Sequence, residues 1–134
     1  MARTVLIVDD VSFVRKTLAD ILTKAHFQVV GEAETGVQAV EMYMRLKPNV
    51  VTMDVVMPQM SGIEATRKIV KKDKNARIII VSAMGQEHMV MEAINAGARD
   101  YILKPFTENE IIRTVEHVIT SDQGGGSARK VASK

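Results

Sequence analysis

Apolar residues follow two alternating patterns along the chain. Five short runs carry apolar, mostly β-branched residues at consecutive positions, and they cover residues 4–8, 28–33, 49–53, 77–81 and 100–104. Runs of this kind are typical of strands that are covered on both faces. Between them, apolar residues recur three or four positions apart, as on the buried side of a helix, over residues 12–25, 35–48, 61–72, 86–98 and 107–120. The chain therefore predicts five strands that alternate with five helices.

Polar residues and glycine mark the ends of several of these helices. Ser12 stands where it would cap the first helix, and Ser61 stands where it would cap the third. Thr107 and Glu110 have the spacing of a capping box at the start of the last helix. Gly97 marks the end of the fourth helix, because glycine readily adopts the backbone conformation that ends helices.

The alternation of strands and helices indicates an α/β fold, a doubly wound five-stranded parallel sheet with helices on both faces. Right-handed crossover connections favour the flavodoxin-like strand order 2-1-3-4-5. In the second helix, Val37, Val40 and Met44 are expected to face the sheet. We expect residues 1–120 to form one domain. Residues 121–134, SDQGGGSARKVASK, have no apolar periodicity and predict a flexible basic tail rich in Gly and Ser.

Composition and charge exclude several classes of protein. The chain has no cysteine, so disulfides, thiolate metal sites and a cysteine nucleophile are excluded. The formal net charge of +2 comes from the tail, and residues 1–120 contain equal numbers of acidic and basic side chains. No basic stripe is interleaved with aromatic residues, so we expect no nucleic-acid partner. The N-terminal apolar run VLIV is too short for a signal peptide or a membrane span, which predicts a cytoplasmic protein without membrane contact.

Polar residues gather at the predicted carboxyl ends of the strands. Asp9 and Asp10 follow the first strand, Asp54 follows the third, Ser82 follows the fourth, and Lys104 ends the fifth. In an open parallel sheet these ends meet at one edge, where such folds bind ligands. Each residue taken alone is also compatible with a helix cap, a turn or a plain surface position. The agreement of four strand ends favours one shared site.

Three carboxylates in one small site repel one another. Two of them about 4 Å apart repel by roughly 4 kcal/mol at an effective dielectric constant of about 20. A divalent cation relieves this repulsion, and an all-oxygen carboxylate site suits Mg²⁺. Asp54 stands alone in the apolar stretch VTMDVVMP and is the candidate nucleophile for forming an aspartyl phosphate, with Asp9 and Asp10 as metal ligands. Lys104 and Ser82 are placed to bind phosphoryl oxygens.

The motifs VLIVDD, MDVVMPQMSG, VSAMG and YILKPF resemble those of response-regulator receiver domains of two-component signalling. The resemblance extends from about Val5 to Ile119, and it is greatest to stand-alone chemotaxis response regulators. It implies a phosphorylation-activated signalling switch, not an enzyme with a separate substrate, whose partners are a histidine kinase and the flagellar motor switch protein. No DNA-binding or catalytic domain follows Ile119, so we expect a monomer that signals through protein contacts.

Carried over by position, the resemblance assigns the acidic residues their roles. Asp54 is expected to be the phosphoacceptor. Asp10 and Asp54 are expected to bind Mg²⁺ directly, together with the backbone carbonyl of Val56, while Asp9 acts through water. The site would thus hold one Mg²⁺ ion beside the residue that is phosphorylated.

The resemblance also assigns the switch that responds to phosphorylation. Ser82 and Lys104 are expected to contact the phosphoryl group after transfer. In the family, the hydroxyl at the Ser82 position is then drawn inward and the aromatic ring at the Tyr101 position follows, which remodels the face formed by the fourth helix, fifth strand and fifth helix. The Lys104-Pro105 peptide bond is expected to be cis, as is usual in the family.

Two apolar residues bear on how long the phosphorylated state lasts. Val56 and Met84 occupy positions where many receiver domains carry polar residues that orient the attacking water. Apolar side chains cannot orient water in this way. We therefore expect slow self-dephosphorylation and a phosphatase as a further partner.

Four other interpretations compete with this one. A haloacid-dehalogenase-like phosphatase also uses an aspartate nucleophile with Mg²⁺, but it needs a second acid two positions later, where this chain has Val56. A flavodoxin-like flavin carrier needs a Ser/Thr-rich phosphate loop where this chain has Asp9 and Asp10. Within the receiver class, the alternatives are a phosphorelay intermediate that passes its phosphoryl group to another protein's histidine, and a docking module that works without phosphorylation.

Overall fold

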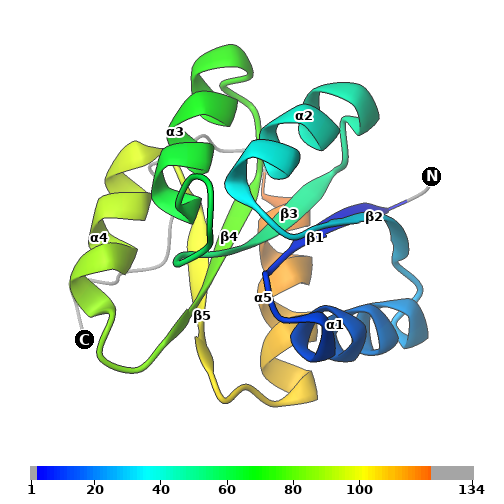
Figure 1. The fold of residues 1–134 in the computed structure, drawn as a ribbon. Helices are drawn as coiled ribbons and strands as arrows, with labels where there is room; N and C mark the ends of the chain where they lie inside the picture. Colours follow the sequence, from blue (N-terminus) through cyan, green and yellow to red (C-terminus); the bar gives the residue numbers. More distant parts are fainter. Residues whose placement is uncertain (1–2, 122–134) are drawn as a thin grey trace.

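The computed structural model describes residues 3–121, and the predicted tail lies outside the described residues from position 122 onward. The strands form one sheet in the order β2-β1-β3-β4-β5, and all neighbouring strands are parallel (Figure 1). This confirms the predicted fold class and strand order. The strands are β1 (Thr4–Val8), β2 (Gln28–Ala33), β3 (Val50–Asp54), β4 (Ile78–Ala83) and β5 (Asp100–Lys104).

Helices cover both faces of the sheet, as predicted (Figure 1). They are α1 (Ser12–Lys24), α2 (Gly36–Leu46), α3 (Gly62–Lys72), α4 (Glu87–Ala96) and α5 (Glu108–Thr120). The pair α1 and α5 packs on one face, while α2, α3 and α4 lie side by side on the other. The sheet therefore lies between two helical layers.

Each helical layer encloses its own hydrophobic core against the sheet. In β1, Leu6 and Val8 face the core under α2, α3 and α4, whereas Val5 and Ile7 face the core under α1 and α5. Successive strand residues point to opposite faces, so a strand between two helical layers has to be apolar at nearly every position. This is why the strands appear in the sequence as continuous apolar runs.

The buried side of α2 differs from the prediction. Val40 and Met44 pack against the core as expected, but Val37 is 47% exposed. Ala39 and Tyr43 occupy the buried positions instead. Because α2 packs against α3 as well as against the sheet, its buried side is set by both contacts and not by its most apolar stripe.

The predicted ends of the later helices are confirmed. The Ser61 hydroxyl accepts a hydrogen bond from a backbone N–H in the first turn of α3. Thr107 and Glu110 form both hydrogen bonds of a capping box at the start of α5. Gly97 ends α4 with φ of +122°, a backbone conformation that side-chain-bearing residues rarely adopt. These local signals are read correctly because each involves residues only a few positions apart.

The prediction that Ser12 caps α1 is wrong. The helix begins one residue earlier than expected, so its N-cap is Val11 and Ser12 is the first helical residue. The Val11 N–H instead donates to the Asp9 carboxylate over 2.9 Å. An aspartate at the end of β1 thus stabilises the turn into α1, and it does so from the site described below.

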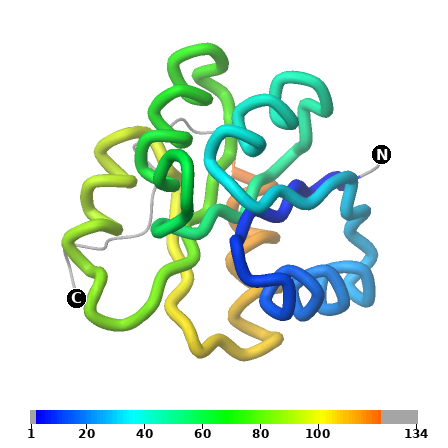
Figure 2. The backbone as a smooth tube through the Cα atoms, in the orientation of Figure 1, coloured from blue at the N-terminus to red at the C-terminus, as the bar shows by residue number. Residues whose placement is uncertain are grey.

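The carboxyl ends of the strands meet at one edge of the sheet. The turns that follow β4 and β5 leave the sheet at the lower side of the view (Figure 2). The strand registers align these ends, since Val8 pairs with Met53, Asp54 with Val81, and Ser82 with Leu103. The predicted site residues therefore come together through the register of the sheet.

Candidate functional site

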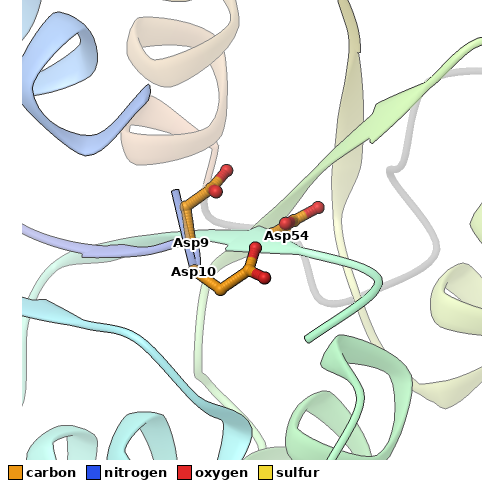
Figure 3. Close-up of side chains that lie close together, drawn as sticks. All are labelled: Asp9, Asp10 and Asp54. Carbon is orange, nitrogen blue, oxygen red and sulfur yellow. The ribbon is translucent and has the colours of Figure 1, made fainter. Parts of the chain in front are cut away.

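Three carboxylates converge at this edge, as predicted (Figure 3). Asp9 and Asp10 follow β1, and Asp54 is the last residue of β3. Each of the three offers a carboxylate oxygen, and these oxygens all lie within 4.8 Å of one another. Asp9 and Asp54 are buried, whereas Asp10 is exposed. The cluster is thus open to solvent on the side of Asp10.

The buried Asp9 is held by several hydrogen bonds. Its N–H donates to the carbonyl of Ala33 in β2 over 3.0 Å. One carboxylate oxygen accepts the Val11 N–H, and the other lies 3.2 Å from the ammonium of Lys104. Asp9 therefore links β1, β2, β5 and the start of α1 at a single point.

Lys104 provides the positive charge of the site. Its ammonium nitrogen lies 3.2 Å from the Asp9 carboxylate and 3.7 Å from that of Asp54. The Lys104-Pro105 peptide bond that follows is cis, as expected. One ammonium balances one of the three carboxylates, so the cluster keeps an excess of negative charge.

Burial and the neighbouring negative charges raise the pKa of Asp54 to about 7. Burial is the largest cause, and the neighbouring charge of Asp9 is the next. Asp10 raises the pKa further, while the ammonium of Lys104 lowers it. The carboxyl oxygens are hard ligands that lie close together, and the Lys104 ammonium balances their negative charge only in part. This donor set fits a divalent cation such as Mg²⁺.

Ser82 is fully buried in β4, and its hydroxyl has no hydrogen-bond partner among the residues that the structure describes. A buried hydroxyl without a partner costs about 1–3 kcal/mol. Buried polar groups nearly always have a partner, so an unpartnered hydroxyl beside the acidic cluster is a candidate for binding a ligand. Its place at the end of β4, next to the end of β3, is the one predicted from the sequence.

The other predicted residues lie around the acidic cluster. Val56 stands two positions after Asp54, in the loop before α3, with half of its surface exposed. Met84 is 71% exposed in the loop after β4. Tyr101 is partly buried in β5 and lines a cavity of about 770 Å³ together with Met84 and Lys104. This cavity lies along β5 and α5, which belong to the surface that is expected to change shape on phosphorylation.

Two residues that support the cluster were not foreseen from the sequence. The guanidinium of Arg15, in α1, donates to the backbone carbonyl of Asp9 over 2.8 Å. Gly62, at the start of α3, lies so close to the carbonyl of Asp54 that an added Cβ would collide with it. Neither residue carries a local signal, because one arginine in an amphipathic helix and one glycine after a serine are both ordinary.

The class of the protein follows from a comparison with known families. Residues 5–116 match the family described as the response regulator receiver domain, and the chain belongs to this family. It is 53% identical to the chemotaxis protein CheY of Thermotoga maritima over 118 residues, which cover 88% of this chain and 98% of the relative. It is 50% identical to CheY of Bacillus subtilis over 119 residues, which cover 89% and 99% of the two chains.

Solved structures of receiver domains have the same fold. The response regulator domain of Thermotoga maritima CheB matches with a TM-score of 0.83 and 36% identity, covering 92% of this chain and 100% of that one. A chain of the CheX-CheY-BeF3-Mg²⁺ complex from Borrelia burgdorferi matches with a TM-score of 0.83 and 37% identity, covering 88% of this chain and 90% of that one. The predicted family is therefore confirmed.

The protein is a CheY-like receiver domain, a phosphorylation-activated switch of two-component signalling. Proteins of this type transmit signals and are not classical enzymes. Within the part of the chain that the structure describes, no helix has both the length and the apolar character needed to span a membrane.

Proposed function

We propose that residues 1–120 form a chemotaxis switch that accepts a phosphoryl group from a histidine kinase on Asp54 and then acts on the flagellar motor switch. The observation that carries this proposal is the Asp54 carboxylate, held at the end of β3 beside two further carboxylates and 3.7 Å from the Lys104 ammonium. The similarity to CheY proteins supports the chemotaxis role. A signal that passes from a kinase to a motor needs a diffusing carrier, so we also propose a cytoplasmic monomer.

Mg²⁺ is the cofactor that the donor set fits. Asp10 and Asp54 would hold it directly with the backbone carbonyl of Val56, and Asp9 would act through water. When bound, the ion supplies positive charge that offsets the carboxylates and the phosphoryl oxygens. Asp54 is protonated to a large extent near neutral pH without such charge, because its pKa lies at about 7. Charge at this position therefore favours the ionised form that is needed for attack.

The transfer itself involves one bond formed and one bond broken. A carboxylate oxygen of Asp54 attacks the phosphorus of a phosphohistidine on the kinase, and a P–O bond forms while the P–N bond breaks. The electron pair of the broken bond stays on the imidazole nitrogen. Lys104 is placed to bind the transferred group's oxygens, and its ammonium already lies within 4 Å of the attacking carboxylate.

The buried Ser82 hydroxyl supports the proposed switch. A phosphoryl oxygen on Asp54 would give this unpartnered hydroxyl an acceptor, so the phosphorylated state gains a hydrogen bond that the other state lacks. Tyr101 follows Asp100 in the neighbouring strand and borders the 770 Å³ cavity, which gives its ring room to move. A changed position of Tyr101 would alter the α4-β5-α5 surface offered to the motor partner.

Phosphorylation of Asp54 is tested by intact-mass spectrometry after incubation with a small phosphodonor. The expected result is one added phosphoryl group on the wild type, dependent on Mg²⁺, and none on Asp54→Asn. Asp20→Asn is the matched control, because it makes the same substitution at an exposed aspartate of α1. A folded wild type that gains no phosphoryl group from a small donor or from a purified histidine kinase would contradict the proposal.

Self-dephosphorylation is expected to be slow, and Val56→Asn is expected to accelerate it by about 2- to 10-fold, which is roughly 0.4–1.4 kcal/mol in the barrier. An amide at this half-exposed position beside Asp54 can orient an attacking water, whereas valine cannot. The measurement is the decay of the phosphorylated mass after the donor is removed. Val37→Asn is the control, because Val37 is similarly exposed on α2 and should leave the decay unchanged.

A long-lived phosphorylated state requires a partner that removes the phosphoryl group. We therefore propose a phosphatase that reaches Asp54 from the open side of the acidic cluster. The CheY relative from Borrelia burgdorferi is solved in complex with CheX, so a CheX-like protein is the partner to test first. If Val56→Asn hydrolysed no faster than the wild type, the reason for expecting this partner would be lost.

A further inference from the structure

Arg15 connects α1 to two other segments at the edge of the acidic cluster. One guanidinium nitrogen donates to the backbone carbonyl of Asp9 over 2.8 Å. The Nε group donates to Glu32 at the end of β2 over 3.0 Å, and the remaining nitrogen lies 3.7 Å from Glu34. The Arg15 side chain is only 11% exposed, so these contacts hold it in one orientation.

The carbonyl that Arg15 binds belongs to the peptide unit between Asp9 and Asp10. Because a peptide unit is planar, a hydrogen bond to its oxygen also restricts the direction of the next residue. The side chain of Asp10 is exposed, and no hydrogen bond or ion pair from within residues 3–121 holds its carboxylate. The position of this carboxylate therefore depends on the backbone. Arg15 holds that backbone through the Asp9 carbonyl, and the Asp9 carboxylate holds it through the Val11 N–H.

The two glutamates explain why Arg15 binds a carbonyl and not a carboxylate of the cluster. A guanidinium prefers carboxylate partners, and the nearby Asp10 would offer one. Glu32 and Glu34 satisfy this preference on the side facing β2. The remaining N–H group then points to the Asp9 carbonyl, which leaves the Asp10 carboxylate available to a cation.

We propose that Arg15 is a positioning residue for the metal site. It holds the turn after β1 so that the carboxylates of Asp10 and Asp54 stay within reach of one Mg²⁺ ion. Arg15 does not touch the ion or the phosphoryl group. This inference rests on the proposed function, because it assigns Arg15 a role toward the cation that the proposed chemistry needs.

The direction of the effect separates positioning from simple electrostatics. Arg15 carries a positive charge near a cation site, so removing that charge without any other change would strengthen Mg²⁺ binding. Loss of positioning would weaken binding instead. Partners that orient metal ligands from outside the ligand set typically contribute about 10- to 100-fold to metal affinity. For Arg15→Met, a positioning role therefore predicts weaker Mg²⁺ binding, whereas simple electrostatics predicts tighter binding.

The test is a Mg²⁺ titration of the full chain, followed through the amide chemical shifts of the turns after β1 and β3. Arg15→Met and Arg15→Lys are both expected to raise the dissociation constant by about tenfold. The lysine variant keeps the charge but lacks the rigid planar fork whose separate nitrogens bind the Asp9 carbonyl and Glu32. Arg3→Met is the matched control, because Arg3 lies just before β1 and pairs with Glu116 through two 3.0 Å hydrogen bonds. The Mg²⁺ affinity of this variant should match that of the wild type.

Phosphorylation by a small phosphodonor provides a second measurement. In both Arg15 variants, the Mg²⁺ concentration that gives half the maximal rate should rise by the same factor as the dissociation constant. The rate at saturating Mg²⁺ should stay within about twofold of the wild type, since Arg15 takes no part in the transfer step. A fall in this saturating rate with unchanged Mg²⁺ dependence would contradict a positioning role.

The possible outcomes are distinct. Mg²⁺ binding that is unchanged or tighter in Arg15→Met, or unchanged in Arg15→Lys, would overturn the inference while the proposed function stands. Should Arg15→Met fail to fold, the lysine variant decides alone, since simple electrostatics predicts no change for it. A wild type that neither binds Mg²⁺ nor accepts a phosphoryl group would overturn both proposals.

Discussion

Asp54→Asn is expected to raise the free energy of unfolding of the metal-free protein by roughly 2–4 kcal/mol at pH 8.5. Burial and the charges of Asp9 and Asp10 raise the pKa of Asp54 from 3.8 to about 7 in the folded protein. At pH 8.5 the folded state must therefore hold an ionised carboxylate that the unfolded chain holds more readily. An amide of nearly the same shape removes this charge and the repulsion with it.

The pH dependence of this effect has a defined sign. A carboxyl group with a raised pKa binds more protons in the folded state than in the unfolded state between about pH 4 and pH 7. The stability of the wild type is therefore highest, as far as Asp54 is concerned, below about pH 4, and it is lost as the pH rises through about 7. The difference in free energy of unfolding between Asp54→Asn and the wild type should fall below about 1 kcal/mol near pH 4.

Urea unfolding, followed by circular dichroism in the presence of EDTA, measures the free energy of unfolding of both proteins at about pH 8.5 and near pH 4. Asp20→Asn serves as the control, because this exposed aspartate should change stability by less than about 0.5 kcal/mol at any pH. Addition of Mg²⁺ should stabilise the wild type and leave Asp54→Asn nearly unchanged, since a ligand stabilises only the state that binds it. Equal stability of wild type and Asp54→Asn at pH 8.5 would falsify the description of Asp54 as a destabilised carboxylate.

Gly62→Ala is expected to lower the free energy of unfolding by about 3 kcal/mol or more. A methyl group at Gly62 would collide with the backbone carbonyl of Asp54, and it would lie 3.0 Å from the side chain of Met53. The Gly62 N–H also donates to the carbonyl of Val55 over 2.7 Å, which fixes its distance from β3. Backbone atoms have to move to admit the methyl group, and Asp54 has to move with them.

Gly85→Ala is the matched control for this prediction. Gly85 has φ of +94°, but a Cβ added there meets nothing within 4 Å. The substitution should therefore lower stability by only about 1–2 kcal/mol, through backbone strain alone. Urea unfolding compares the two variants, and a Mg²⁺ titration of Gly62→Ala should show weaker binding because Asp54 is displaced. If Gly62→Ala lowered the free energy of unfolding no more than Gly85→Ala does, the start of α3 would be able to shift away from Asp54 at little cost, and the prediction would be wrong.

The amino-acid sequence by itself determined the fold of this protein. A strand between two helical layers needs apolar residues at nearly every position, so β1, β3 and β4 are recognisable as continuous runs. The spacing between consecutive strands admits one helix each. The parallel order then places the strand ends at one edge. The meeting of Asp9, Asp10, Asp54 and Lys104 follows from this topology, because it depends on where strands end and not on details of packing.

Other features were decided only by the tertiary structure. Val37 was expected to be buried and is exposed, because the orientation of α2 depends on its contact with α3. The pKa of Asp54 depends on burial and on charges from a different strand. The bond from Arg15 to Asp9 and the approach of Gly62 to Asp54 join segments whose separation is fixed only when helices pack on the sheet. Periodicity along a chain reports which side of an element is buried, but distances between elements follow from how all of them pack together.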